Sequence, residues 1–292
     1  MRRFFTLRKI LVLLGAFGLL FYLASAYALG SIYLAPKPST IGDPPAWLGA
    51  KPVEIEVDSG KRIHGWWMDK GEGTPALLLL HGIWGNRLTM VQRARLFHEA
   101  GYSVLLIDMP SHGESYPDRV SFGYFESKGI DAAYRWIRSQ HPQAKIGADA
   151  ISLGGAALVY SQHVNDYDAI LLESTYSTIQ KALYNRIHTQ VGIFSNLFYP
   201  TLLVQIPLRL DIDLDSLSPL ARMPTIRAPT FLLSGSRDLS TEPSETREMF
   251  QALAGQKELW IMEKAAHEDL CAFDSASYST HALAFLNKHL KR

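Results

Sequence analysis

Ser152 lies in a segment whose residue spacing suits a nucleophile. Residues 150–154 read Ala-Ile-Ser-Leu-Gly, follow a short apolar run and open a helical pattern. Small residues two positions before and two after the serine let the backbone turn sharply and hold the hydroxyl clear of a sheet. A serine hydroxyl attacks an acyl carbon at neutral pH only when a base takes its proton. The chemistry therefore requires a base elsewhere in the chain.

His267 and Asp238 can supply the base and its orienting acid. An imidazole is the side chain best suited to accept such a proton near neutral pH, so His267 can serve as the base for Ser152. Asp238 follows a strand-like segment and a turn of small residues, Ser-Gly-Ser at 234–236, and would orient the ring and stabilise its charged form. Glu173 ends another strand and is a second position from which a carboxylate can reach the histidine. Both carboxylates stay open at this point.

Two backbone N–H groups would bind the negative charge that develops on the substrate. They belong to Leu153, the residue after the nucleophile, and to Ile83, in the loop that follows a buried strand. His81 and His112 each precede a glycine in a loop, with no carboxylate or cysteine partner at ligand spacing. We expect these two histidines to support their loops by hydrogen bonds, and we expect no metal and no cofactor.

Apolar runs alternate with helical patterns along residues 47–292, which predicts one α/β domain with a mostly parallel, doubly wound sheet. An alternating pair of segments before them predicts an N-terminal antiparallel hairpin. The hairpin strands are Val53–Val57 and Arg62–Met68; the buried strands are Ala76–Leu80, Ser103–Ile107, Lys145–Ala148, Ala169–Leu172, Thr230–Leu233 and Leu259–Met262. The helices are expected around Thr89–Ala100, Gly129–Gln140, Leu153–His163, Glu242–Leu253 and Ser277–Lys291.

A long insertion interrupts this alternation between Glu173 and Pro229. It exceeds fifty residues and is rich in Tyr, Phe and Leu. Long insertions in compact domains are usually functional. We therefore expect a helical cap at about residues 177–222 that encloses an apolar acyl pocket over Ser152. The alternative is an extra pair of core helices with no role in substrate choice.

The first 46 residues differ in composition from the rest of the chain. Four basic residues within residues 1–9 precede an uncharged stretch from Ile10 to Leu34, long enough to span a hydrocarbon core of roughly 30 Å. This predicts a transmembrane anchor, with a cytoplasmic N-terminus and the domain on the other side, in the periplasm if the source is bacterial. Residues 24–28 also resemble signal-peptide cleavage sites, so a secreted domain is the alternative. Residues 35–46 hold four prolines and predict an extended linker instead of a packed element.

Composition excludes several other classes of protein. The chain has 29 Lys+Arg against 28 Asp+Glu, a formal charge of +1 and no run of five like charges, so it lacks the electrostatic pattern of a nucleic-acid-binding protein. Its single cysteine, Cys271, excludes an intramolecular disulfide and a cysteine-rich zinc site. The expected partners are a small-molecule or lipid-like acyl substrate and, through the N-terminal helix, a membrane.

Residues 50 to 292 resemble the α/β-hydrolase superfamily in four motifs that occur in the family's order. His-Gly-Ile-Trp-Gly-Asn at 81–86 is similar to the family's oxyanion loop, and residues 101–115 (GYSVLLIDMPSHGES) are similar to the strand and loop that follow it. Residues 228–238 match the segment that delivers the acid, and residues 265–268 lie where the family places its histidine. The chain order Ser152, Asp238, His267 is that of the superfamily. The sequence departs from the family pattern in two places. Ala150 replaces the first glycine of the nucleophile elbow, the sharp turn that carries Ser152, and Met-Pro-Ser at 109–111 replaces Arg-Gly.

The resemblance implies a membrane-anchored serine hydrolase that cleaves an ester or thioester through a Ser-His-Asp triad and an acyl-enzyme intermediate. Within the superfamily, the chain is most similar to small single-span, membrane-anchored members allied to the serine aminopeptidase and prolyl-oligopeptidase catalytic domains. A peptidase is therefore an alternative, and acyl transfer to an acceptor other than water is another. An alternative from a different class is a catalytically silent, membrane-tethered binding module. The observation against it is that every catalytic position holds a residue able to do its chemistry.

Overall fold

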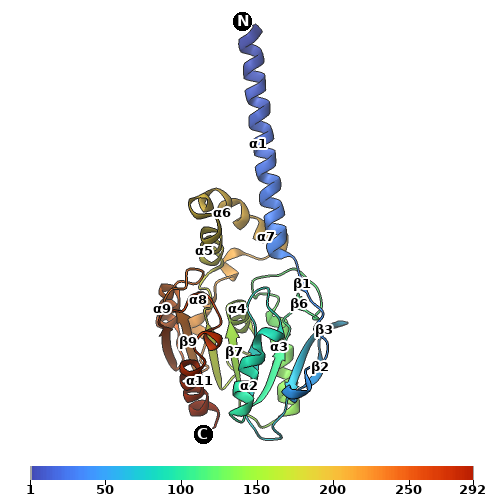
Figure 1. Cartoon of the computed structure of the whole chain (residues 1–292), viewed down its shortest axis with the longest axis vertical. Helices are drawn as coiled ribbons and strands as arrows, with labels where there is room; N and C mark the ends of the chain where they lie inside the picture. Colours follow the sequence, from blue (N-terminus) through green and yellow to red (C-terminus); the bar gives the residue numbers. More distant parts are fainter. Residues whose placement is uncertain (1, 292) are drawn as a thin grey trace.

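An eight-stranded sheet forms the centre of the computed structural model, which describes residues 2–291, with side chains from Leu7 onward (Figure 1). The strand order is β10-β9-β8-β7-β4-β5-β3-β2. Neighbouring strands are parallel except for β3, which is antiparallel to both β2 and β5. The predicted mostly parallel sheet with an N-terminal hairpin is confirmed. The strands are β2 (Lys51–Asp58), β3 (Lys61–Met68), β4 (Ala76–Leu80), β5 (Ser103–Ile107), β7 (Ile146–Ile151), β8 (Ala169–Glu173), β9 (Thr230–Gly235) and β10 (Lys257–Met262).

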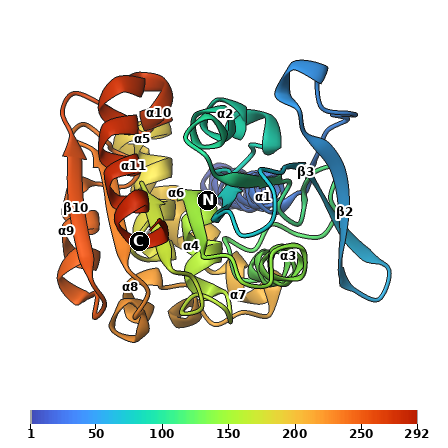
Figure 2. The same cartoon turned by 90° about the horizontal axis from the view of Figure 1, so that it is seen from below.

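The central strands are mostly apolar because helices cover both faces of the sheet (Figure 2). Successive leucines of β4 show this: Leu78 and Leu80 pack into one core, Leu77 and Leu79 into the other, and all four are fully buried. One face is covered by α2 (Val91–Glu99), α10 (Leu270–Phe273) and α11 (Ser275–Leu290). The other is covered by α3 (Ser127–Gln140), α4 (Leu153–Tyr160) and α9 (Pro243–Ala252).

The insertion between β8 and β9 folds into α5 (Ile179–Val191), α6 (Ser195–Leu203), α7 (Gln205–Leu210) and α8 (Pro219–Arg222). The side chain of Thr178 caps α5 by accepting a hydrogen bond from the N–H of Lys181. α5 ends at Val191 and is followed by Gly192, whose φ of 57° suits glycine. A 3-10 turn (η3, Gly192–Phe194) then leads into α6. Figure 1 shows α5, α6 and α7 on the side of the domain from which the N-terminal helix leaves.

The N-terminal helix α1 (Arg2–Leu34) begins at the first described residue, so it includes the basic residues that were expected to precede it. The structure does not describe the side chains of Arg2 and Arg3. Residues Leu7–Leu34 are long and apolar enough to cross a membrane, and most of their side chains are exposed. Ile179–Leu210 meets the same criterion of length and composition, but there the chain is divided into α5, α6 and α7.

The linker after α1 is extended, as predicted, but it packs against the domain, where no packed element was expected. Its backbone is extended, and β1 (Lys37–Pro38) pairs with β6 (His112–Gly113). The N–H groups of Ile41 and Gly42 both donate to Glu114 Oε1 at 2.9 Å. A proline-rich extended segment leaves its remaining backbone groups free to bond, and the loop around Glu114 supplies the partners. α1 is therefore joined to the domain without a flexible spacer.

Candidate active site

Ser152 occupies a strained turn between β7 and α4. Its φ of 51° and ψ of −109° lie in a region that residues with a side chain seldom adopt. The strand and helix approach closely here, since a Cβ at Gly154 would lie 2.8 Å from the carbonyl oxygen of His81. Ala150, which departs from the family pattern, is fully buried within β7 and fits there. The sequence thus forms the elbow without its usual first glycine.

His267 is held by Asp238. The ring Nδ1 lies 2.8 Å from Asp238 Oδ2, and the ring is partly exposed while the carboxylate is buried. Asp238 Oδ1 accepts the backbone N–H groups of Ser240 at 2.9 Å and Thr241 at 2.8 Å, which fix its orientation. Because a carboxylate only accepts hydrogen bonds, Nδ1 carries the proton and Nε2 is left as an acceptor. This is the tautomer that a general base requires.

Glu173, the second candidate for the acid, has a different partner. Both of its oxygens lie 2.8 Å from the guanidinium of Arg93, and Oε1 also accepts the N–H of Leu270 at 3.1 Å. Complete burial raises the pKa of Glu173 to about 7, against the opposing effect of Arg93. Of the two carboxylates that the sequence left open, Asp238 is the one bonded to His267.

Arg93 is the centre of a buried ion cluster that the sequence analysis missed. Besides Glu173 it contacts Asp149, Asp269 and the hydroxyl of Tyr278, and the arginine side chain has no exposed area. Asp269 also accepts the N–H of Cys271 and so caps α10, directly after the loop that carries His267. The cluster joins α2, β7, β8 and α11 to that loop. Its members are far apart in the sequence, and no local pattern marks them.

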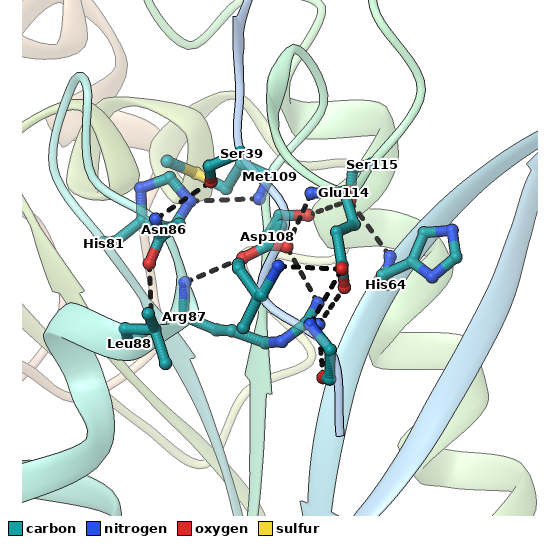
Figure 3. Close-up of polar contacts among 12 residues, drawn as sticks. Ser39, His64, His81, Asn86, Arg87, Leu88, Asp108, Met109, Glu114 and Ser115 are labelled. Carbon is teal, nitrogen blue, oxygen red and sulfur yellow. Dashed lines mark hydrogen bonds and ion pairs between the residues drawn. The ribbon is translucent and has the colours of Figure 1, made fainter. Parts of the chain in front are cut away.

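His81 supports the loop that carries Ile83. Its Nδ1–H donates to the carbonyl oxygen of Gly82 at 2.8 Å, and its Nε2 accepts the N–H of Met109 at 3.1 Å (Figure 3). Burial, together with the neighbouring His112, lowers the pKa of His81 to about 3. His112 bonds in turn to the carbonyl oxygen of Pro110 at 3.0 Å. The prediction that these two histidines support loops is confirmed.

Arg87, Asp108 and Glu114 form a second polar cluster beside this loop (Figure 3). Asp108 accepts the N–H of Arg87 at 2.7 Å, its guanidinium at 2.8 Å and the N–H of Glu114 at 2.9 Å. Arg87 also pairs with Glu114. Although burial opposes the shift, bonds from Gly42, Ile41 and Arg87 lower the pKa of Glu114 to about 2. The cluster fastens the linker after α1 to the loop that begins at His81.

Four of the proposed site residues meet at a pocket whose walls are mainly apolar. Ser152, His267, Ile83 and Leu153 all line it, with Asp238 behind the histidine. As the first residue of α4, Leu153 has a backbone N–H with no partner inside its own helix. The other wall residues come mainly from the cap, the oxyanion loop and α1: Tyr33, Trp84, Phe122, Tyr176, Ile179, Ala182, Leu183 and Arg186.

Tyr33 shows that α1 contributes to the pocket itself. Its ring stacks on Trp84 with 5.8 Å between ring centroids, and its hydroxyl donates to Gln190 in the cap at 3.1 Å. The guanidinium of Arg186 lies 5.0 Å from the centroid of the Trp84 ring on which Tyr33 stacks. From the sequence, Tyr33 is predicted only as part of the anchor. It lines the pocket because the cap folds back against α1, and no local sequence pattern reveals that contact.

A second, narrow space adjoins the pocket between α1 and the cap. Tyr33, Phe122 and Leu183 line both spaces. Its other walls are apolar apart from Gln205, and they include Leu202 and Ile206. The residues that line the two spaces extend from Ser152 to Leu34 of α1. Among the residues that the structure describes, no group of three or more His, Cys, Asp or Glu side chains is placed to hold a metal ion.

His81 should make the protein less stable in acid. Its pKa is about 3 in the folded protein and 6.5 when unfolded, so the unfolded state binds more protons between these values. The free energy of unfolding should fall by about 1.4 kcal/mol per pH unit from this residue as the pH drops below 6.5. Urea unfolding of the full chain in detergent, for the wild type and His81→Gln, measures the contribution. Parallel pH curves for the two proteins would contradict it.

Comparisons with known proteins give the fold. No family model matches the sequence. An uncharacterized Bacillus subtilis protein, YqkD, is 24% identical over 212 residues, which is 71% of this chain and 70% of that protein. An esterase of Pyrococcus furiosus is similar in structure, with a TM-score of 0.73, 20% identity and coverage of 88% of this chain and 99% of that one. A bacterial membrane phospholipase A has a TM-score of 0.63, 20% identity and 99% coverage of both chains.

Proposed function

The chain has the α/β-hydrolase fold, and from this premise we propose that it is a membrane-anchored serine hydrolase that cleaves carboxylic esters of lipid-like acyl chains. The observation that carries the proposal is the meeting of Ser152, in its strained turn, with His267, held by Asp238, at one apolar pocket. The esterase and the phospholipase among its structural neighbours favour this chemistry.

The proposed reaction begins when Ser152 Oγ attacks the ester carbonyl carbon as Nε2 of His267 takes its proton. The N–H groups of Ile83 and Leu153 bind the carbonyl oxygen as it becomes negative. The C–O bond to the alcohol then breaks, and His267 returns the proton to the leaving oxygen. Water, deprotonated by the same ring, attacks the acyl-enzyme; the bond from the acyl carbon to Ser152 Oγ then breaks, the ring returns the proton to Oγ, and the carboxylic acid leaves. Asp238 stabilises the charged ring in both halves.

The pocket walls favour an acyl ester over an aminopeptidase substrate. Among the described residues that line the pocket there is no Asp or Glu to bind a free α-amino group, and the one Lys or Arg side chain there is that of Arg186. An apolar pocket that adjoins an apolar cavity suits an acyl chain instead. Hydrolysis of p-nitrophenyl esters of increasing chain length, beside aminoacyl p-nitroanilides, tests this choice. Faster cleavage of the aminoacyl substrates would overturn the proposal.

Leu183 should determine the length of acyl chain that the protein accepts. Its side chain lines both the pocket and the adjoining cavity. Leu183→Trp should fill the space on both sides of this position, so that kcat/KM falls for long-chain esters and changes little for an acetyl ester. Leu183→Met, of similar volume, is the matched control and should keep the profile. Fluorophosphonate labelling verifies that each variant has a folded site. Equal losses on short and long esters would leave the cap helices as core helices without a role in substrate choice.

We further propose that α1 stays attached and anchors the protein, with the N-terminus in the cytoplasm and the domain on the other side. The proposal is supported by the apolar length of α1 and by Tyr33, which α1 contributes to the pocket wall. Carbonate washing of membranes should leave the full chain in the pellet, and sequencing should find no new N-terminus at Tyr27 or Leu29. Release by carbonate, or either new terminus, would contradict the anchor.

A further inference from the structure

The cap has an exposed apolar surface on η3, α6 and α7. From Val191 to Leu208 the chain holds no charged residue. Ile193 is 80% exposed and Leu208 78% exposed. We call the cap patch the following exposed residues: Ile193, Phe194, Leu197, Val204 and Leu208. A soluble protein seldom leaves so many large apolar side chains of neighbouring helices in water, and larger exposed patches mark protein or membrane contacts.

The helices that carry the cap patch, α6 and α7, lie beside α1 (Figure 1). The hydroxyl of Tyr22 donates to the carbonyl oxygen of Leu197 at 2.5 Å, and Gln205 Nε2 donates to the carbonyl oxygen of Ala26 at 3.0 Å. Nearer the domain, the guanidinium of Arg209 donates to Ser31 Oγ at 3.0 Å. The cap patch therefore lies beside residues 22–31 of α1, within the segment that is apolar enough to cross a membrane.

The length of α1 sets the depth of these contacts in a bilayer. Leu7–Leu34 comprises 28 residues, which extend about 42 Å at 1.5 Å per residue. A helix needs only about 20 residues to span a hydrocarbon core. If the span begins at Ile10, directly after the last basic residue, it ends near Leu29. Tyr22 then lies about 10 Å inside the core. Arg209 contacts Tyr27 and Ser31, on either side of the boundary, where a cation can reach the lipid headgroups.

We propose that the cap patch is immersed in the acyl-chain region of the leaflet on the domain's side of the membrane. Its partner is the lipid bilayer, in continuity with the surface of α1. The inference rests on the proposed anchoring by α1 and does not depend on the reaction. The pocket residue Tyr33 lies about 6 Å beyond Leu29 along the helix, which is the headgroup level. A lipid ester could therefore reach the pocket from the leaflet without crossing water.

Fluorescence quenching in vesicles tests the depth of the cap patch. The full chain with Ile193→Cys is labelled with an environment-sensitive maleimide and reconstituted in phosphatidylcholine vesicles with or without lipids brominated in their acyl chains. Burial raises the pKa of Cys271 to about 12, so the unsubstituted chain serves as the unlabelled blank. Glu72→Cys is the matched control, because Glu72 is exposed before β4 at the edge of the sheet opposite Ser152.

Brominated lipid should quench the label at position 193 several-fold while aqueous iodide leaves it unchanged, and the label at position 72 should show the reverse. Iodide quenching at both positions would overturn the inference and leave the anchor intact. Protection of position 193 from both quenchers would also overturn it, because a protein surface, such as a second copy of the chain, would then cover the patch. Carbonate release of the labelled chain would instead disprove the anchor on which the inference rests.

Discussion

Ser152→Ala should abolish covalent labelling of the full chain by a fluorophosphonate and lower kcat for ester hydrolysis by about 10⁶-fold, the loss measured when a triad nucleophile is removed. The hydroxyl is the only group at this position that can form the acyl-enzyme. The variant should fold, because alanine keeps the side chain's Cβ, and the turn is held by the bond from the N–H of Ser152 to the carbonyl oxygen of Glu173 at 2.8 Å.

A second serine in the pocket wall provides the control for this experiment. Ser240 also lines the pocket, but its link to the site is a backbone N–H donated to Asp238 at 2.9 Å. Ser240→Ala removes a neighbouring hydroxyl and keeps that hydrogen bond, so the variant should still be labelled. If Ser152→Ala were still fully labelled and Ser240→Ala were not, the nucleophile would be Ser240 and the proposed assignment would be wrong.

The strands could be predicted from the sequence because each one is a local pattern. The runs Ala76–Leu80 and Ser103–Ile107 are apolar at every position except Ser103, since both faces of the sheet are covered, and their boundaries match the structure. Ser152 and Asp238 could be proposed for a related reason. They follow strands, and the carboxyl ends of parallel strands meet at one edge of the sheet.

What the sequence did not reveal depends on contacts between distant segments. Arg93 lies on an amphipathic helix, where an arginine is ordinarily expected to be exposed, yet it is buried among carboxylates from three other segments. The composition of the proline-rich linker predicted an extended segment without packing, because prolines disfavour helices and internal sheets. Its bonds to Glu114 come from a loop more than 70 residues later. Only the assembled fold brings such partners together.

The second large effect on kcat is expected from substitution of Asp238, the carboxylate bonded to His267. Asp238→Asn should lower kcat by about 10⁴-fold, as removal of the orienting acid does in a triad protease. The asparagine amide would donate to Nδ1 of His267 where the carboxylate now accepts at 2.8 Å, so the proton would move to Nε2. A ring protonated at Nε2 cannot accept the proton of Ser152. Thermal stability should change little, since the Asn side-chain oxygen can still accept the N–H groups of Ser240 and Thr241.

Glu173→Gln is the matched substitution of the other carboxylate, and it should act on stability instead of on turnover. Glutamine still accepts a hydrogen bond from Arg93 but leaves the buried guanidinium with one fewer negative partner. Breaking a buried ion pair costs about 3–5 kcal/mol, and because Asp149 and Asp269 remain beside Arg93, the loss should lie at or below the lower end. Per folded molecule, counted by fluorophosphonate labelling, kcat should stay within a few-fold of the wild type. The opposite ranking of the two variants would mean that Glu173 orients His267, and that the Asp238–His267 contact does not persist during catalysis.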